Sequence, residues 1–244
     1  MQLIASLLYT LWLFLWTFIY AVFFVLASLL LPIQARFALA RFYAHTVLTM
    51  LRWICGLDYR VEGLENFPQA SHVAMWKHAS AWETFAQFVI GRPQAIVLKR
   101  ELMLLPFFGW GLAQLRAIAI NRTAGASAVN QVVEQGIARL QDGISVIVFP
   151  EGTRVAAGET RKYGVSGALL ASRAGCQIVP VAHDAGYYWP RRGLLKRRGC
   201  IQVRVGAPID AAGRDPRSIN AEVQAWIEHS IAQMQTSGSQ RNGA

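Results

Sequence analysis

The sequence predicts an α/β fold: a mainly parallel or mixed sheet flanked by helices, preceded by an N-terminal membrane-embedded helical segment. Two observations lead to this prediction. Beyond residue 56, short apolar runs typical of buried strands alternate with segments of helical periodicity, as in sheets covered by helices on both faces. The first 56 residues are instead almost continuously apolar. We therefore expect a membrane motif of one or two helices at 1–56, an α/β domain at 57–234 and a disordered tail at 235–244.

The N-terminal segment is long enough to cross a bilayer. No charged residue occurs from Leu3 to Leu31, and at about 1.5 Å per residue such a helix exceeds the roughly 30 Å hydrocarbon core. The next stretch, Ile33–Cys55, interleaves arginines with large apolar residues, as expected of a helix at the membrane interface. A spanning helix and a hairpin that bends at Pro32 and enters one leaflet both fit. A cleaved signal peptide fits poorly, because the first basic side chain, Arg36, follows the apolar run.

The distribution of charge indicates the partners of the chain. Arg36, Arg41 and Arg52 follow the apolar segment, so if that segment spans the membrane, the positive-inside rule places the domain in the cytoplasm. The localisation we expect is the cell inner membrane, with the domain on its cytoplasmic side. The net charge of +10 favours anionic partners, of which membrane lipid is the simplest. No nucleic acid is expected, because no recognisable nucleic-acid module accompanies this charge. The three cysteines show no CxxC spacing, and we expect no metal site.

The expected strands are apolar runs bounded by turn residues. Asp58–Glu62 has the pattern of an edge strand, and the run 71–76 follows a turn at Pro68. The run 144–149 is the clearest buried strand. The remaining strands are expected at 95–98, 116–120, 177–182 and 201–205.

The expected helices are recognised by periodicity and by the residues at their ends. A helix at 80–90 ends at Gly91 and Pro93, and one at 216–234 starts with a proline. Two others are expected at 126–140 and 164–174. The apolar segment 102–115 contains Pro106, Gly109 and Gly111, which predicts a broken helix or a hydrophobic loop.

A histidine lies where α/β enzymes place reactive groups. His78 follows one expected strand and precedes a helix, and Ser80 is a natural N-cap that leaves His78 in the turn. Glu83 then falls in the first helical turn, where its carboxylate can hold the Nδ1 proton and leave Nε2 free to accept a proton from an alcohol. Equally, Ser80 and Glu83 form a capping box, in which Glu83 only returns to the Ser80 backbone. The segment alone does not separate the two interpretations.

A second group of polar residues follows the strand 144–149. Gly152 permits close approach of the backbone, Thr153 offers a hydroxyl, and Arg154 offers a bidentate fork for phosphate. The alternative is a hairpin turn with a solvated arginine. Glu151 and Arg154 are a poor choice for a mere turn after so apolar a strand, which favours an anion-binding site.

Two further groups of polar residues are candidates for a functional role. His183 and Asp184 form an alternative acid and base pair, although adjacent side chains seldom point together. Basic residues at 191–198 follow Tyr187-Tyr188-Trp189, a combination suited either to the headgroup layer of a membrane or to a solvated loop.

From about Arg60 to Pro208, these residues resemble the glycerolipid acyltransferase family that includes bacterial 1-acyl-glycerol-3-phosphate acyltransferases. The run Phe149-Pro150-Glu151-Gly152-Thr153-Arg154 matches the acceptor-binding motif of that family completely. The first motif of the family is His, four residues, Asp, whereas this chain has Glu83 in place of the aspartate. The second motif ends Phe-Ile-Asp-Arg; here Ala119-Ile120-Asn121-Arg122 keeps the arginine and loses the aspartate. Val179-Pro180-Val181 resembles the fourth motif.

The resemblance implies a membrane-bound O-acyltransferase. Its donor is an acyl thioester, either acyl-CoA or acyl carrier protein, and its acceptor is the free hydroxyl of the lysophospholipid 1-acyl-glycerol 3-phosphate, giving phosphatidic acid. His78 is then the base and Glu83 its partner. The acceptor is bound by Lys99, Arg122, Glu151, Gly152, Thr153 and Arg154. A thioester is already activated, so no cofactor is needed, in agreement with the lack of a GxxxxGK[ST] loop.

Two rival functions remain open at this point. Because Asn121 replaces the aspartate of the second motif, the same chemistry on another acceptor, glycerol 3-phosphate or a lyso-aminolipid, is one. A catalytically silent membrane adaptor that binds anionic lipid, with Glu83 only as a cap, is the other.

Overall fold

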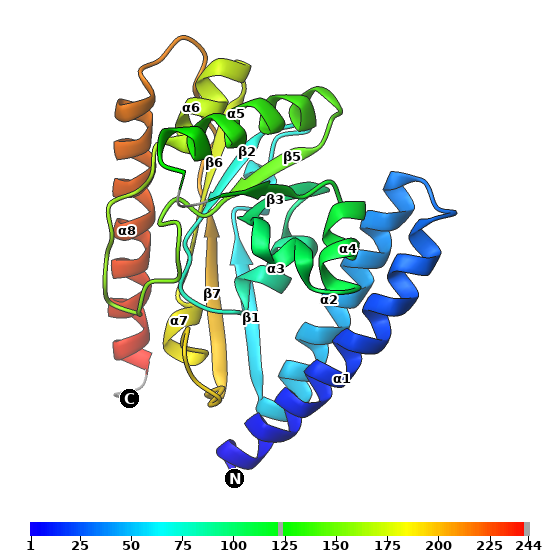
Figure 1. Cartoon of the computed structure of the whole chain (residues 1–244). Helices are drawn as coiled ribbons and strands as arrows, with labels where there is room; N and C mark the ends of the chain where they lie inside the picture. Colours follow the sequence, from blue (N-terminus) through cyan, green and yellow to red (C-terminus); the bar gives the residue numbers. More distant parts are fainter. Residues whose placement is uncertain (122–123, 242–244) are drawn as a thin grey trace.

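A computed structural model of the chain describes the backbone of residues 1–121 and 124–241 and the side chains as far as residue 236. Figure 1 shows a central sheet with helices on both sides. The helices are α1 (Gln2–Ser28), α2 (Ile33–Cys55), η1 (Leu64–Asn66), α3 (Glu83–Ile90), η2 (Arg100–Leu104), α4 (Phe108–Gln114), α5 (Ala126–Gln141), α6 (Ser166–Ala174), α7 (Ala185–Tyr188) and α8 (Pro216–Arg241). The strands are β1 (Leu57–Glu62), β2 (Val73–Trp76), β3 (Gln94–Lys99), β4 (Ile118–Ile120), β5 (Ser145–Val148), β6 (Gln177–His183), β7 (Gly199–Val205) and β8 (Ile209–Asp210).

The sheet is mixed, and the predicted fold class is confirmed. Its strand order is β1-β7-β6-β2-β5-β3-β4, with β8 paired to β6. Strands β6, β2, β5, β3 and β4 run parallel to one another, whereas β7 and β8 are antiparallel to β6. The five parallel strands therefore end at one edge of the sheet, which is where α/β proteins build their sites. Strand β1 lies at the other end of the sheet as the predicted edge strand.

Alternate residues of the central strands enter two separate cores, because successive side chains of a strand point to opposite faces. On β2, Val73 and Met75 join the core beneath α5, α6 and α8, whereas Ala74 and Trp76 join the core beneath α2 and α3. All four side chains are fully buried. A sheet with both faces covered accounts for the nearly continuous apolar runs of its strands.

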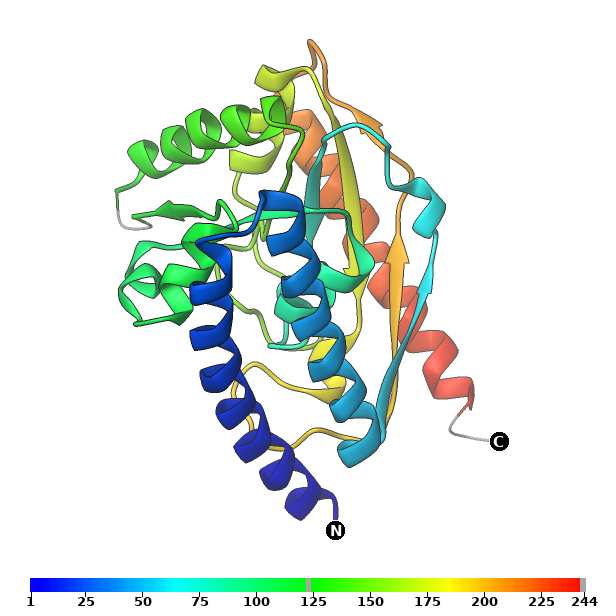
Figure 2. The ribbon, with the colours of Figure 1, turned by 90° about the vertical axis from the view of Figure 1, so that its right-hand side faces the viewer.

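Helices α1 and α2 form a hairpin that lies along one side of the domain, opposite α8 (Figures 1 and 2). Hydrogen bonds join them along their length: Tyr9 to the Val47 carbonyl at 3.2 Å, and Tyr20 to the Leu39 carbonyl at 2.9 Å. By length and hydropathy, α1 is the one described helix that could cross a membrane. Most of its large side chains are nevertheless exposed, including Leu11, at 70%, and Phe14, at 71%.

Both ends of α1 contact the α/β domain. Near the N-terminus, Ser6 accepts the Lys196 backbone N–H at 2.9 Å, and the Lys196 ammonium donates to Thr10 and to the Leu194 carbonyl. Near the other end, the Phe24 ring packs against Gly111 of α4. The basic run 191–198 is therefore not uniformly a headgroup-facing or solvated cluster, because Lys196 is buried and holds α1 in place.

The structure differs from the expected elements in three places. Helix α3 begins at Glu83 instead of residue 80, because the Glu83 carboxylate folds back onto the preceding turn. Helix α8 continues to Arg241, so the backbone is still helical over most of the expected tail, where no proline interrupts it. The short elements α7 and β8 were not expected. Segment 102–115 has the predicted break, between η2 and α4.

Candidate active site

The candidate residues gather where the parallel strands end. His78 lies two residues beyond β2, and the run Phe149–Arg154 begins directly after the neighbouring strand β5. Lys99 is the last residue of β3, on the far side of β5, and His183 is the last residue of β6. Four strands distant in sequence thus deliver polar side chains to one edge.

The imidazole of His78 is paired with the carboxylate of Glu83. The distance from Nδ1 to Oε1 is 2.9 Å. The same oxygen accepts the backbone N–H groups of Ala79, at 3.0 Å, and Ser80, at 2.9 Å. Ser80 in turn accepts the N–H of Trp82 through its hydroxyl, at 3.1 Å, and so stabilises the turn that holds His78 outside the helix. Both interpretations of the sequence are present at once, because one carboxylate oxygen binds the ring and caps the turn.

Glu83 is fully buried, and its surroundings keep it ionised. Burial alone would raise its pKa, but the hydrogen bond from His78, the nearby His183 and the N–H of Ser80 together lower the pKa below the ordinary value. An ionised carboxylate can only accept, so Nδ1 of His78 carries the proton. The other nitrogen, Nε2, has no hydrogen-bond partner among the described residues. The side chain is 11% exposed. Nε2 can therefore accept a proton.

The turn after β5, residues 150–155, is called the glycine turn below. It contacts the backbone of His78 on both its N–H and its carbonyl. Glu151 accepts the His78 N–H through Oε2 at 2.6 Å, and the N–H of Val155 donates to the His78 carbonyl at 2.8 Å. The Phe149 ring stacks on the imidazole, with 4.2 Å between ring centroids. The glycine turn and the histidine are therefore joined directly, as a site that combines base and anion binding requires.

Within this turn, the residues predicted to bind an anion are accessible. Gly152 has φ of 69°, a left-handed conformation that favours glycine, and it is exposed, as is Thr153. Arg154 is half-buried, and its carbonyl accepts a hydrogen bond from Arg191. This contact brings the basic loop before β7 to the edge of the turn.

The other predicted binding residues lie in different surroundings. Lys99 is exposed at the end of β3. Arg122 lies outside the described residues. Glu151 was grouped with the acceptor-binding residues, but its side chain is fully buried and its oxygens contact protein groups, the His78 N–H and the Lys77 ammonium, the latter at 2.8 Å. The position of its carboxylate favours a supporting role over contact with an acceptor.

The alternative pair of His183 and Asp184 does not form an acid and base unit. Nε2 of His183 donates to the Lys77 carbonyl at 2.9 Å, and Asp184 accepts the Gln202 N–H at 2.8 Å. His183 is instead the neighbour of Glu83, with Nε2 3.9 Å from Oε2. Burial lowers the pKa of His183, although Glu83 opposes this effect. The sequence did not indicate that His183 and Glu83 are neighbours, because they are brought together by the pairing of β6 with β2 and not by their spacing in the chain.

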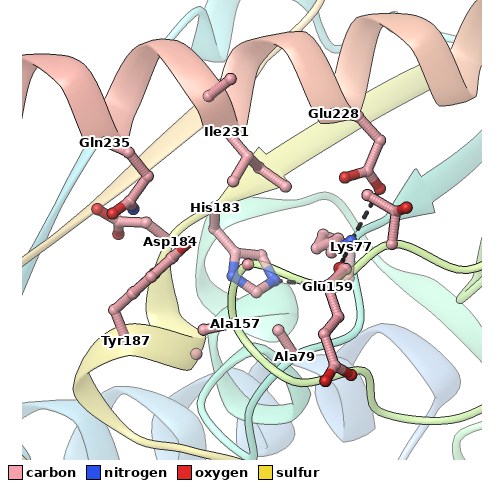
Figure 3. Close-up of a pocket in the computed structure, with 14 residues that line it drawn as sticks. Lys77, Ala79, Ala157, Glu159, His183, Asp184, Tyr187, Glu228, Ile231 and Gln235 are labelled. Atoms are coloured by element: carbon pink, nitrogen blue, oxygen red, sulfur yellow. Dashed lines mark hydrogen bonds and ion pairs between the residues drawn. The ribbon is translucent and has the colours of Figure 1, made fainter.

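Sequence reasoning also missed a buried charge cluster behind the site. Lys77 contacts Glu151 and Glu228 of α8, each at 2.8 Å, and Tyr163 donates to Glu228 at 3.0 Å. Lys77 and Glu228 also line a cavity of about 260 Å³ between α8 and the segment 157–160 (Figure 3). Ala79 and His183 line the same cavity, whereas His78 does not.

Comparisons with known proteins show the family of the chain. Residues 58–184 match the family described as Acyltransferase. A 1-acyl-sn-glycerol-3-phosphate acyltransferase of Pseudomonas aeruginosa is 40% identical over 209 residues, which cover 84% of this chain and 81% of that protein. A protein of the same name from Cocos nucifera is 27% identical over 201 residues, covering 80% and 65%.

The fold also matches a solved structure, that of the 1-acyl-sn-glycerophosphate (LPA) acyltransferase PlsC from Thermotoga maritima. The TM-score is 0.81 at 22% sequence identity, over 96% of this chain and 98% of that one. The likeness extends through the N-terminal hairpin as well as the sheet. With the family match and the 40% identity over most of its length, the chain belongs to the acyltransferase family and is an enzyme of the 1-acyl-sn-glycerol-3-phosphate acyltransferase type.

Proposed function

We propose that the protein is a membrane-bound enzyme that moves a fatty acyl chain from an acyl thioester to the free hydroxyl of 1-acyl-glycerol 3-phosphate, forming phosphatidic acid. The observation that carries this proposal is the paired His78 and Glu83 held directly against the glycine turn. A base alone would fit many reactions. A base whose backbone is bonded to an anion-binding turn fits deprotonation of an alcohol that carries a phosphate.

The bond changes assign one task to His78. Nε2 removes the proton from the acceptor hydroxyl while its oxygen attacks the carbonyl carbon of the thioester. The carbon–sulfur bond then breaks, and the leaving thiolate takes the proton from the imidazolium. Glu83 holds Nδ1–H throughout and stabilises the positive charge on the ring between the two proton transfers. No covalent acyl-enzyme and no cofactor are required.

The glycine turn binds the acceptor phosphate in this proposal. Gly152 lets the phosphate approach the backbone, Thr153 donates its hydroxyl, and the Arg154 guanidinium donates two parallel hydrogen bonds. Lys99, exposed at the end of the neighbouring strand β3, adds a second charge, and we assign Arg122 the same task from the resemblance of its motif. Fixing both substrates supplies much of the rate beyond proton transfer.

The hairpin of α1 and α2 attaches the enzyme to one leaflet. Both ends of α1 contact the same α/β domain, so α1 cannot cross a bilayer unless the domain enters it. The exposed face of α1 is apolar, as expected of a helix at the boundary between headgroups and acyl chains. Three exposed apolar side chains extend this surface: Leu104, Phe108 and Trp110. Among the two arrangements left open by the sequence, this favours the monotopic hairpin. The net charge of +10 favours the anionic lipids of the cytoplasmic leaflet of the inner membrane.

The proposal is tested with the purified full-length protein in lipid vesicles. Two donors, acyl-CoA and acyl carrier protein, are each combined with 1-acyl-glycerol 3-phosphate, glycerol 3-phosphate and a lyso-aminolipid. Transfer to 1-acyl-glycerol 3-phosphate with the highest kcat/KM is expected. Preference for another acceptor would assign the same chemistry a different substrate, and no transfer to any of them would remove the proposed function.

A further inference from the structure

We propose that Glu228, on the C-terminal helix α8, is a positioning residue for His78. Glu228 holds the Lys77 ammonium against Glu151, and Glu151 fixes the backbone of His78. The inference rests on the proposed function, in which His78 is the base. Glu228 lies outside the segment that matches the family and 150 residues from the histidine.

The contacts form a continuous series from α8 to the turn that follows β2. Lys77 is 5% exposed and lies between two carboxylates, 2.8 Å from Oε1 of Glu151 and 2.8 Å from Oε1 of Glu228. Tyr163 donates its hydroxyl to the same Glu228 oxygen at 3.0 Å. Two donors from different segments therefore fix the Glu228 carboxylate, and the carboxylate in turn fixes the ammonium.

The last contact in this chain is to the histidine itself. The second oxygen of Glu151, Oε2, accepts the backbone N–H of His78 at 2.6 Å. The His78 carbonyl is bound by Val155 of the same turn, at 2.8 Å. The Glu151 carboxylate is fully buried in a closely packed region. Movement of the Lys77 ammonium therefore displaces this carboxylate, and the backbone of His78 moves with it.

The cavity beside this cluster explains why Lys77 needs a holding group. Lys77 and Glu228 lie at the same end of the cavity of about 260 Å³ (Figure 3). Glu159 and Asp184 also line it, and the Glu159 carbonyl is already 3.5 Å from the ammonium. Without Glu228, the ammonium has both space and other acceptors to turn toward. Glu228 therefore selects the position in which Lys77 serves Glu151.

The charge state of Glu151 provides a measurable consequence. Burial raises the pKa of Glu151 to about 7, opposed chiefly by the charge and hydrogen bond of Lys77 and by the His78 N–H. Repulsion from Glu228 raises this pKa by a smaller amount. Tyr163 also faces the cluster, and the titratable groups His183, Glu159 and Asp184 line the cavity beside it. Losing Glu228 removes its repulsion, which alone would lower the pKa of Glu151. It also frees Lys77, and the loss of the larger stabilising effect of Lys77 on the Glu151 carboxylate raises that pKa. The pKa of Glu151 should therefore rise.

The test compares Glu228→Ala, Glu228→Gln and the control Glu222→Ala in the full-length enzyme, assayed with 1-acyl-glycerol 3-phosphate and a thioester donor across the pH range. For Glu228→Ala we expect kcat at pH 7 to fall about tenfold with KM for the acceptor nearly unchanged. We also expect the acidic limb of the plot of kcat against pH to move to higher pH by about half a unit. Glu228→Gln keeps an acceptor for Lys77 and Tyr163 and should stay closer to the wild type. Glu222 lies on the same helix, is exposed and pairs with Arg214, so its loss should change neither value.

A wild-type kcat and an unmoved acidic limb in folded Glu228→Ala would overturn the proposal. If that variant does not fold, Tyr163→Phe removes one of the two donors that fix Glu228 and should shift the limb in the same direction by less; an unmoved limb there overturns the proposal equally. Failure of the proposed function is a different result, because the wild-type enzyme itself would then show no transfer in the same assay.

Discussion

The Nδ1 atom of His78 lies 2.9 Å from Oε1 of Glu83, although the two residues are five positions apart in the chain. Within one helix, such residues are turned about 140° from each other and cannot meet. They meet because α3 begins at Glu83, which leaves His78 in the preceding turn. The N–H groups of Ala79 and Ser80 bind the same oxygen, so the turn is held by the group that orients the base.

This shared oxygen predicts how Glu83→Gln behaves. An amide oxygen can still accept from Ala79 and Ser80, so the variant should fold and lose only the part of the stability that depends on the charge of the carboxylate. The amide carries no charge to stabilise the imidazolium or to secure the Nδ1 tautomer, and kcat should fall at least about a hundredfold. Steady-state kinetics and circular dichroism measure the two effects. The matched control is Glu65→Gln at an exposed glutamate, and retained turnover in Glu83→Gln would assign Glu83 only the cap.

The ionised state of Glu83 also predicts a dependence of stability on pH. Its folded pKa is lowered below the ordinary value of a glutamate carboxyl, so the carboxylate contributes stability that is present above this ordinary pKa and lost as the pH falls through the folded pKa. Urea unfolding of the wild type and Glu83→Gln, at neutral pH and at about pH 3, should therefore give free energies of unfolding that differ at neutral pH and converge in acid. If the free energies of unfolding of the two proteins differed more at about pH 3 than at neutral pH, ionised Glu83 would not stabilise the fold.

Gly152→Ala tests the conformation of the turn. At φ of 69° an added Cβ meets no described atom within 4 Å, so the cost arises from the backbone alone and should be about 1 kcal/mol of the free energy of unfolding. KM for the acceptor should rise as well, because the turn is the proposed phosphate site. Gly193→Ala is the control, since that glycine does not have positive φ and an added Cβ would meet Pro190 only at 3.9 Å. Equal stability of the two variants would argue against the left-handed turn.

Arg154→Lys separates a bidentate contact from a simple positive charge. A lysine keeps the charge but cannot donate two parallel hydrogen bonds, so KM for 1-acyl-glycerol 3-phosphate should rise about tenfold while KM for the donor stays constant. The backbone of the turn should persist, because Arg191 binds the carbonyl of residue 154 and not its side chain. Kinetics with each substrate varied in turn measure this difference. An effect confined to the donor would place Arg154 at the thioester instead.

The sequence predicted those parts of the site that depend on neighbours in the chain. A pairing of His78 with Glu83 was one of two interpretations that a turn, a cap and five residues of spacing allowed, and the position of the glycine turn follows from one buried strand and its six residues. Anion binding by that turn stays a prediction. The same reasoning could not place Lys77 beside Glu228, because the position of α8 against β6 and α6 is set by tertiary packing. Nor could it place His183 next to Glu83.

Boundaries and surface assignments were less well predicted for a related reason. The first residue of α3 depends on which group caps the turn, and tertiary contacts of Glu83 decided it. Lys196 belongs by composition to an exposed basic run, but the N-terminal turns of α1 cover it. A count of charges cannot reveal such a contact between residues 190 positions apart.

The most direct measurement is transfer of a labelled acyl chain from a thioester to 1-acyl-glycerol 3-phosphate by His78→Ala in lipid vesicles. We expect the wild type to form phosphatidic acid, the variant to lose at least about a hundredfold in kcat, and both to remain equally attached to the vesicles. Transfer by His78→Ala at the wild-type rate would show that His78 is not the base.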